Sequence, residues 1–332
     1  MRNAGLDPMR LWRAGRRSFN GVSVALQRRL LRKRYFERGI HDYRLLLDSA
    51  DPGINRQLLR GGAREPEQKY VLERHLRRGM YALDLGANIG YYTVMMARLV
   101  GEQGRIYAVE PHPDNYALLS ANVRRNRVTQ VAMENVAIDV QDAQRPLLTV
   151  DHCNWHSFHD PRITTDAPWK SHYRRRMKEP VLVRTRALSR YLEDKPQLDL
   201  LRMDLEGYEV EILDALAALP SSLTRRLHIL METHPEFYHP RRHDMRAVLQ
   251  RLHERHGYRV KYLISDCQHG SRRMPHLQPA MLVLQRHGYG PRHILKMFDS
   301  RAIYMGVAMR DAIELICTSE NVHAVFLEPT DV

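Results

Sequence analysis

The chain has 332 residues, of which 43% are apolar, and carries a formal net charge of +14. This length supports one substantial core in one or two domains, and no run of 18 apolar residues predicts a membrane-spanning helix. Cys153, Cys267 and Cys317 are too far apart for a disulfide framework or a zinc site, which favours a reduced, cytoplasmic protein.

The first 36 residues hold much of the excess positive charge. Ten Lys or Arg side chains stand there against one acid, Asp7, and apolar side chains recur among them at roughly helical spacing. Such a basic amphipathic helix packs on the protein body, lies on an anionic membrane, binds nucleic acid or acts as a mitochondrial presequence. We expect residues 1–60 to be a basic helical extension and residues 61–332 to be the functional domain. If residues 1–36 do not pack on the body of the protein, we expect them to contact an anionic membrane.

Residues 80–93 have the pattern of a strand, a glycine turn and a helix start. The apolar run ends at Asp84, and Gly86, Asn88 and Gly90 lie in the turn. Glycines let the backbone approach a ligand, and the helix start presents free N–H groups, so the pattern predicts a nucleotide-type site. A dinucleotide fingerprint needs glycine where Asn88 stands, and Asp84 would repel a pyrophosphate. Asp84 can bind an ammonium group, and the helix start beside it can bind a carboxylate. S-Adenosylmethionine carries both groups, so the pattern favours it as the ligand.

The next predicted strand, 105–109, ends in Glu110 and Pro111. An acid at the tip of the second strand lies where a carboxylate grips the two hydroxyls of a ribose. An ordinary charged loop end is the alternative interpretation. Asn135 and Val136 end the following apolar stretch and are candidates to border the adenine, and a plain strand end explains them equally well.

The remaining elements alternate between strands and helices. Helices are expected at 113–125, 209–219 and 243–256, and strands at 129–138, 198–205, 227–231, 258–264 and 324–327. Residues 140–180 have no steady period and are expected to form a substrate-side insertion. The alternation predicts an α/β fold with a doubly wound, mostly parallel sheet, helices on both faces, and a ligand site at the carboxyl ends of the strands.

A second group of acids follows the predicted strand at 198–205. Asp204 and Glu206 are two positions apart, so both point to one side, and Gly207 permits a tight turn into the next helix. Asp204 and Glu206 are candidates to orient the cofactor's ammonium group, to position an acceptor hydroxyl or to act as general base. Capping of the helix start by Glu206 and Glu209 is the alternative.

These motifs resemble the FkbM family of S-adenosylmethionine-dependent methyltransferases between about residues 60 and 235. The resemblance rests on Asp-Leu-Gly-Ala-Asn-Ile-Gly-Tyr-Tyr-Thr at 84–93, Glu-Pro-His-Pro at 110–113, Asn-Val-Ala-Ile at 135–138, Leu-Arg-Met-Asp-Leu-Glu-Gly at 201–207 and Glu-Thr-His at 232–234. It implies a class I Rossmann-like fold, S-adenosylmethionine as cofactor, and O-methylation of hydroxyls on sugars, glycans or secondary metabolites. The family usually has Lys where this chain has Arg202, and residues 236–332 match less clearly, so the substrate is less defined than the cofactor.

The residues themselves also favour an oxygen acceptor. The end of the 198–205 strand lacks the prolines and stacking aromatic of sites for base amines, and no cysteine stands there to attack a pyrimidine carbon. A sugar hydroxyl needs a base within reach, for which Asp204, Glu206, His234 and His156 are candidates. We expect in-line displacement onto a small-molecule or glycan hydroxyl, with an RNA methyltransferase or a non-catalytic cofactor-binding protein as alternatives. No metal is expected, although a divalent ion between Asp204 and the acceptor is the other option.

Overall fold

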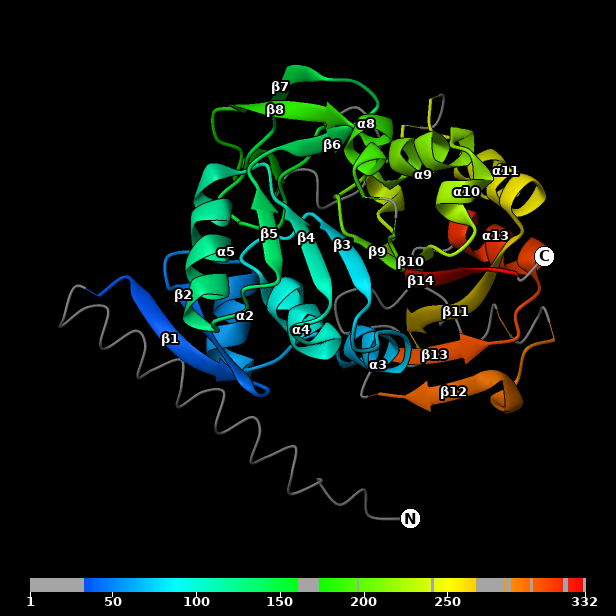
Figure 1. Ribbon diagram of the computed structural model, residues 1–332, viewed down its shortest axis with the longest axis horizontal. Helices are drawn as coiled ribbons and strands as arrows, with labels where there is room; N and C mark the ends of the chain where they lie inside the picture. The colour runs from blue at the N-terminus through cyan, green and yellow to red at the C-terminus, as the bar shows by residue number, and fades with distance from the viewer. Residues whose placement is uncertain are drawn as a thin grey trace, which may run out of the picture.

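The computed structural model describes residues 33–160, 173–195, 197–239, 242–266, 284, 288–298, 301–318 and 322–330. At its centre is a nine-stranded sheet in the order β12 (Ile294–Met297), β13 (Arg301–Met305), β11 (Tyr258–Asp266), β14 (Val322–Pro329), β10 (His228–Glu232), β9 (Leu200–Met203), β3 (Tyr81–Leu85), β4 (Arg105–Val109) and β5 (Val131–Glu134) (Figure 1). The strands from β10 to β5 pair in parallel, whereas β14, β11, β13 and β12 join antiparallel. In this sheet β13 and β14 run against the other strands, which confirms the prediction of a mostly parallel sheet.

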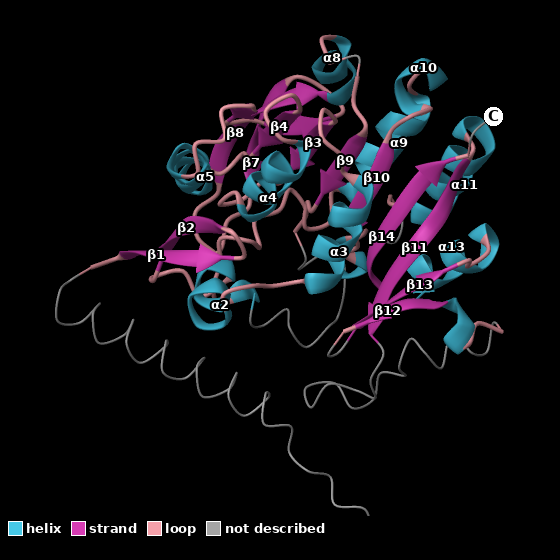
Figure 2. Ribbon diagram, turned by 60° about the horizontal axis from the view of Figure 1, so that its bottom comes forward, coloured by secondary structure: helices cyan, strands magenta, loops and turns pink. Residues whose placement is uncertain are grey.

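Helices cover both faces of this sheet, which confirms the doubly wound α/β prediction (Figure 2). One face packs against α3 (Pro66–His75), α4 (Tyr91–Val100) and α5 (Pro113–Arg125), and the other against α8 (Leu188–Glu193), α9 (Glu209–Ala218), α11 (Met245–His256) and α13 (Met309–Thr318). The short helices α10 (Ser221–Thr224), η1 (Pro235–Phe237) and η2 (Pro291–His293) lie between these elements in the chain. Two buried apolar layers therefore enclose the sheet, one on each side.

The side chains of each central strand alternate between these two layers. In β3, Leu83 and Leu85 pack in the layer of α9, whereas Ala82 packs in the layer of α4. Asp84 lies between the two leucines, so the pleat turns it toward α4. Arg202 of β9 is its register partner on the same face. The alternation thus places an acid and a guanidinium side by side beneath a helix.

The segment before the sheet is a hairpin followed by a helix. Strands β1 (Tyr35–Ile40) and β2 (Tyr43–Asp48) pair antiparallel, and α2 (Ile54–Gly61) follows. The Asn122 side chain of α5 hydrogen-bonds the backbone N–H and C=O of Leu46 at 2.6 and 3.2 Å, which holds the hairpin against α5. The helical extension expected over 1–60 is therefore wrong over the hairpin, where buried and exposed residues alternate with a period of two.

The remainder of the basic N-terminal stretch, residues 1–32, lies outside the described residues, and with it most of the predicted membrane contact. Among the described helices, none combines the length and the apolarity needed to cross a membrane. Arg34, the last basic residue of the stretch, is committed to an ion pair with Asp48 at 2.6 Å, and Lys33 lies over the ring of Phe36 at 5.4 Å. These two described basic side chains therefore contact the hairpin.

The predicted strand at 129–138 is two strands that belong to different sheets. Residues of β5 extend the central sheet, whereas β6 (Ala137–Asp139) joins β8 (Val181–Ala187) and β7 (Ala143–Leu147) in a three-stranded sheet of order β6-β8-β7. The chain after β7 makes isolated bridges from Leu148 to Ser157 and from Val150 to Met177. Much of the predicted 140–180 insertion thus consists of strands and bridged segments. Residues 161–172 of the insertion lie outside the described residues.

Candidate functional site

A cavity lies at the carboxyl ends of β3, β4 and β9, where the sequence predicts a ligand site. Its lining comes from the loops after these strands, from β6, and from the segment that follows β7: Leu85, Gly86, Asn88, Val109, Glu110, Pro111, Asn115, Ala137, Ile138, Leu147, Cys153, Asn154, His156, Ser157, Phe158, Asp204, Leu205, Glu206 and Tyr208. Of the predicted cofactor residues, this set includes Gly86, Asn88, Glu110, Pro111 and Asp204.

The glycine turn after β3 is left-handed at three positions. Gly86 has φ +74°, Asn88 +52° and Gly90 +89°. A Cβ on Gly86 would lie 2.1 Å from the backbone oxygen of Asp204, so only glycine lets the two strand-end loops touch. A Cβ on Gly90 would lie 2.9 Å from a methyl group of Leu119 in α5. Gly90 therefore serves the packing of α4 on α5, and it does not line the cavity.

Glu110 is the buried acid of the cavity wall. Its carboxylate accepts hydrogen bonds from the backbone N–H of Asn88 at 2.8 Å and of His112 at 2.9 Å, and from Asn115 Nδ2 at 3.4 Å. Burial raises the pKa of Glu110 to about 7, against the lowering effect of these hydrogen bonds. Its oxygens suit the two hydroxyls of a ribose, and the apolar side chains nearby suit a purine. The residues present thus fit the nucleoside half of the predicted cofactor.

Asn135 and Val136 do not line the cavity. The Asn135 side chain donates to the backbone oxygens of Glu110 and Pro111 at 2.8 and 2.9 Å and so holds their loop in place. Val136 is 3% exposed and packs in the core. Ala137 and Ile138, the next two residues, line the cavity instead. Asn135 and Val136 therefore do not make the predicted direct contact with adenine. They support the loop and the core beside the cavity.

Asp84 also lies outside the cavity, in contrast to its predicted contact with an ammonium group. It is fully buried, accepts a hydrogen bond from Thr93 Oγ1 at 2.6 Å, and lies 3.5 Å from Arg202 Nη1. Burial raises the pKa of Asp84, whereas Arg202 lowers it. The strand pleat is the reason for the difference, because it directs Asp84 to the α4 face. Asp84 is thus an internal partner of Arg202.

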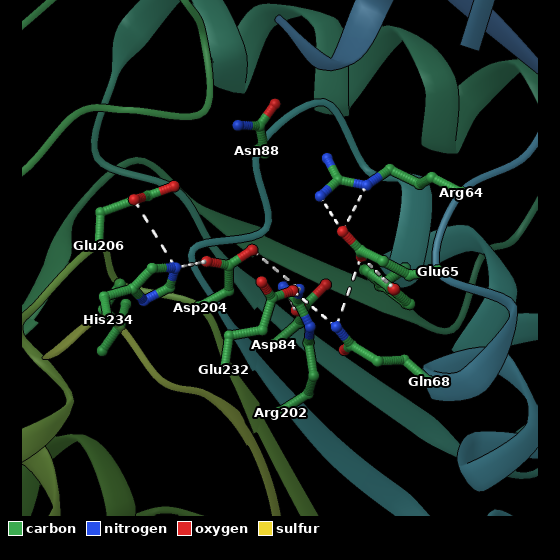
Figure 3. A network of polar contacts seen from close by, with 12 residues as sticks. Arg64, Glu65, Gln68, Asp84, Asn88, Arg202, Asp204, Glu206, Glu232 and His234 are labelled. Atoms are coloured by element: carbon green, nitrogen blue, oxygen red, sulfur yellow. Dashed lines mark hydrogen bonds and ion pairs between the residues drawn. The ribbon is translucent and has the colours of Figure 1, made fainter. Parts of the chain in front are cut away.

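Arg202 is the centre of a buried polar network (Figure 3). Its Nη2 lies 3.0 Å from Asp204 Oδ2 and 3.2 Å from Glu232 Oε1, and its guanidinium carbon lies 4.2 Å from the centre of the Tyr92 ring. These carboxylates raise the pKa of Arg202 although burial lowers it. One guanidinium therefore holds Asp204 at the cavity edge, together with two further acids.

His234 joins the two predicted catalytic acids. Its Nε2 lies 3.7 Å from both Asp204 Oδ1 and Glu206 Oε2, and its Nδ1 lies 2.9 Å from Glu209 Oε1 (Figure 3). Burial lowers the pKa of His234, but the three carboxylates outweigh this and raise it well above the usual value. These contacts favour the imidazolium form, which has no free lone pair. The structure brings the three predicted catalytic residues Asp204, Glu206 and His234 together, and the carboxylates around His234 oppose the neutral ring that a base requires.

The start of α3 contributes residues that sequence reasoning missed. Gln68 Nε2 donates to Glu232 Oε1 at 2.7 Å, and Glu65 accepts from the Tyr92 hydroxyl at 2.6 Å and pairs with Arg64 (Figure 3). Burial, with Asp204 and Glu65 nearby, raises the pKa of Glu232 to about 8. No motif marks Glu65 or Gln68, because only the fold brings α3 beside the end of β10.

Residues 151–158 form a strap across the cavity. The backbone oxygen of Cys153 accepts from Asn88 Nδ2 at 2.9 Å and from Asn115 Nδ2 at 2.7 Å. Ser157 Oγ donates to the backbone oxygen of Glu206 at 2.6 Å. His156 stacks on His112 with ring centres 4.2 Å apart, and burial lowers the pKa of His156 to about 3. The strap thus fastens the glycine turn to the acidic turn, and a neutral His156 belongs to it.

The described residues also include two groups with metal-ligand chemistry that are distant in the sequence, namely Asp204, Glu232 and His234, and His159, Glu211 and His243. In the first group the guanidinium of Arg202 already lies between the two carboxylates. In the second group, His159 Nε2 hydrogen-bonds Glu211 Oε1 at 2.8 Å, His243 Nε2 lies 3.1 Å from the same oxygen, and His243 Nδ1 accepts the backbone N–H of His239. Hydrogen bonds and ion pairs therefore account for both groups.

Several known proteins are similar to parts of the chain. Protein-L-isoaspartate O-methyltransferase of Caenorhabditis elegans is 36% identical over 22% of this chain and 33% of its own length, and that of Methanothrix thermoacetophila is 40% identical over 18% and 28%. The chain thus matches about a third of the length of these curated relatives. Among solved structures, M. jannaschii TYW2 in complex with AdoMet is 13% identical with a TM-score of 0.41, covering 90% of this chain and 88% of that one. Precorrin-6y C5,15-methyltransferase of Geobacter metallireducens is 15% identical with a TM-score of 0.39, over 81% and 90%.

The Methyltransferase FkbM domain matches residues 84–260, which is more than half of the chain. The matched range includes the glycine turn, Glu110, the two predicted catalytic acids and His234, and excludes the β1–β2 hairpin and α3. This match confirms the family resemblance found in the sequence. The chain belongs to the FkbM methyltransferase family.

Proposed function

We propose that this protein methylates a hydroxyl oxygen of a sugar, glycan or secondary metabolite. The observation that carries the proposal is the convergence of Asp204 and Glu206 on the imidazolium of His234 at the cavity edge. Two carboxylates held by a fixed cation provide acceptors for the proton of a neutral hydroxyl. S-Adenosylmethionine, when bound, supplies a methyl group that is already activated by its sulfonium.

The cavity residues divide the task of holding this cofactor. Glu110 would accept the two ribose hydroxyls, and Pro111, with Ala137 and Ile138, would border the adenine. The backbone of the turn at Asn88 and the start of α4 would face the carboxylate, because helix N-termini favour anions. Asp204, rather than Asp84, is the acid placed to meet the ammonium group. This assignment keeps the predicted chemistry and moves two contacts, those to the ammonium group and to the adenine, to other residues.

The acceptor hydroxyl gains nucleophilicity at the 204–207 turn. A carboxylate of Asp204 or Glu206 accepts the hydroxyl's hydrogen bond and then its proton as the oxygen attacks, a step that contributes about 10²- to 10⁴-fold in comparable enzymes. His234 holds the two acids and carries no proton away. The 151–158 strap limits the access of water to the cavity, which strengthens these electrostatic contacts.

The charge of the site opposes an anionic acceptor. Asp204 and Glu206 face the place where the acceptor enters, and the nearby cations Arg202 and His234 are already paired with acids. A substrate carboxylate, of the kind that the curated relatives are named for, would meet like charge there, as would an RNA phosphate. A neutral polyol meets no such repulsion, and its hydroxyls can donate to the two carboxylates. The local charge therefore favours a hydroxyl over both anionic alternatives.

Labelled S-adenosylmethionine tests the acceptor class directly. The protein is incubated with glycan, small-metabolite, lipid and RNA fractions and with an isoaspartyl peptide, and the labelled product is then treated with mild base. A methyl ether keeps its label, whereas a methyl ester releases it as methanol. Retained label in a glycan or metabolite fraction is the expected result. Label that base releases, or label confined to RNA, contradicts the proposal.

Variants of the two acids test the site itself. Asp204→Asn and Glu206→Gln should each reduce kcat by about 10²-fold or more, because the proton acceptor is weakened. Asp214→Asn is the matched control, since Asp214 lies on the exposed side of α9 in an ion pair with Arg251. Full activity in both Asp204→Asn and Glu206→Gln contradicts the assignment of the base to this turn.

A further inference from the structure

Glu209, the first residue of α9, places a fully buried carboxylate behind the 204–207 turn. Its Oε1 accepts the backbone N–H of Leu205 at 3.0 Å and of Gly207 at 3.3 Å, and lies 2.9 Å from His234 Nδ1. Its Oε2 accepts the Tyr238 hydroxyl at 3.2 Å. One side chain therefore joins the turn after β9 to the segment after β10.

The turn that Glu209 holds has an unfavourable backbone. Glu206 has φ +47° and Gly207 has φ +104°. A residue with a side chain is disfavoured in the left-handed region, so Glu206 needs compensating contacts to keep this backbone conformation. A Cβ on Gly207 would lie 2.3 Å from Cβ of Phe237, which closes the turn from the other side. Hydrogen bonds from two backbone N–H groups to a charged acceptor supply the compensation.

The same carboxylate determines the protonation of His234. A carboxylate only accepts hydrogen bonds, so His234 Nδ1 must carry a proton toward Glu209. The groups that face this ring are Asp204 and Glu206 on the turn, Glu209 on α9, and Tyr238, whose hydroxyl lies 3.3 Å from the backbone nitrogen of His234. With acids at both ring nitrogens, the imidazolium form is favoured, and its Nε2–H is directed at the two catalytic acids.

We propose that Glu209 is a positioning residue for methyl transfer, which fixes the 204–207 turn and directs the His234 Nε2–H toward Asp204 and Glu206. This inference rests on the proposed function of that turn. Glu209 is buried behind the turn and does not line the cavity, so it acts through His234 and through Glu206. Its second role is to exclude a neutral His234 that could take the acceptor proton in place of the carboxylates.

Glu209→Gln is the informative variant, because the amide oxygen still accepts the two backbone N–H groups while the charge is lost. Glu211→Gln is the matched control, since Glu211 lies on the same helix but contacts His159 and His243. We expect Glu209→Gln to bind S-adenosylmethionine within about twofold of wild type and to lose about 10- to 100-fold in kcat, by analogy with the range found when the partner that orients a metal-bound imidazole is changed. Glu209→Gln should add no further loss in a His234→Gln background.

Nitrogen NMR of His234 measures the positioning role independently of turnover. In the wild-type protein both ring nitrogens should stay protonated above the usual pKa of imidazole, whereas in Glu209→Gln the ring should lose a proton at a lower pH than in the wild type. A neutral His234 in the wild type overturns the inference even if Glu209→Gln fails to fold. Equal kcat and equal titration in Glu209→Gln and Glu211→Gln also overturn it. Failure of the wild type to bind S-adenosylmethionine would instead count against the proposed function, and the NMR result would stand separately.

Discussion

The buried Glu110 predicts that the affinity for S-adenosylmethionine depends on pH. Burial raises the pKa of this carboxyl to about 7 in the free protein, so it is partly protonated at neutral pH. The ribose hydroxyls donate to the ionised form, and cofactor binding therefore requires loss of that proton. The ionised fraction of a group with this pKa rises about tenfold from pH 6 to pH 8, which corresponds to about 1.4 kcal/mol of binding free energy. We expect Kd to decrease by that factor over this range, with a proton released on binding near pH 6.

Calorimetric titration in buffers of different ionisation enthalpy measures both Kd and the released proton. Glu110→Gln should bind more weakly at every pH and show a flatter pH profile, because the titrating group is gone. Glu134→Gln, at the end of the adjacent strand β5, is the control and should retain the wild-type slope. A wild-type Kd that changes by less than about twofold, or an equal slope in Glu110→Gln, refutes the assignment of the ribose to Glu110.

Four further outcomes follow from the site. The folded-state pKa of Glu110 is raised from 4.5 to about 7, so its contribution to stability is present below pH 4.5 and is lost as the pH rises through 7. The difference in unfolding free energy between wild type and Glu110→Gln should therefore change by about 3 kcal/mol over that range, as measured by denaturant unfolding. Gly86→Ala should lose more stability and cofactor affinity than Gly79→Ala, because both glycines have positive φ but only a Cβ at position 86 would meet the backbone of another segment. Thermal unfolding and cofactor titration measure these losses. Equal losses in the two variants would contradict the close approach of Gly86 to Asp204. Arg202→Met should lower the unfolding free energy by about 3–5 kcal/mol because it leaves buried acids without their cation, and Arg202→Lys should cost less. Turnover should persist in EDTA. If turnover is lost in EDTA and recovers in magnesium, a metal ion and not Arg202 neutralises these acids in the active protein.

The sequence located the cofactor turn because that turn is encoded locally. Apolar runs, a glycine turn and an acid at the next strand end are contiguous patterns, and they place Gly86, Asn88 and Glu110 at the cavity where the structure has them. The β1–β2 hairpin was missed because its basic flank and apolar spacing also fit a helix. Strands β12 and β13 and helix α13 were missed because the chain before them has no clear period.

What a side chain does at this site depended on the tertiary structure. The pleat of β3 turned Asp84 away from the cavity and onto Arg202, a partner 118 positions away in the sequence. The pKa of His234 is raised only because three carboxylates from the 204–207 turn and α9 surround it, and α3 reaches Glu232 only in the folded chain. Chain-local patterns therefore determined the position and the chemical class of the cofactor site. The charge and the direction of a side chain arise from contacts between distant segments, and the fold alone decided which acid lines the cavity and which groups hold the 204–207 turn.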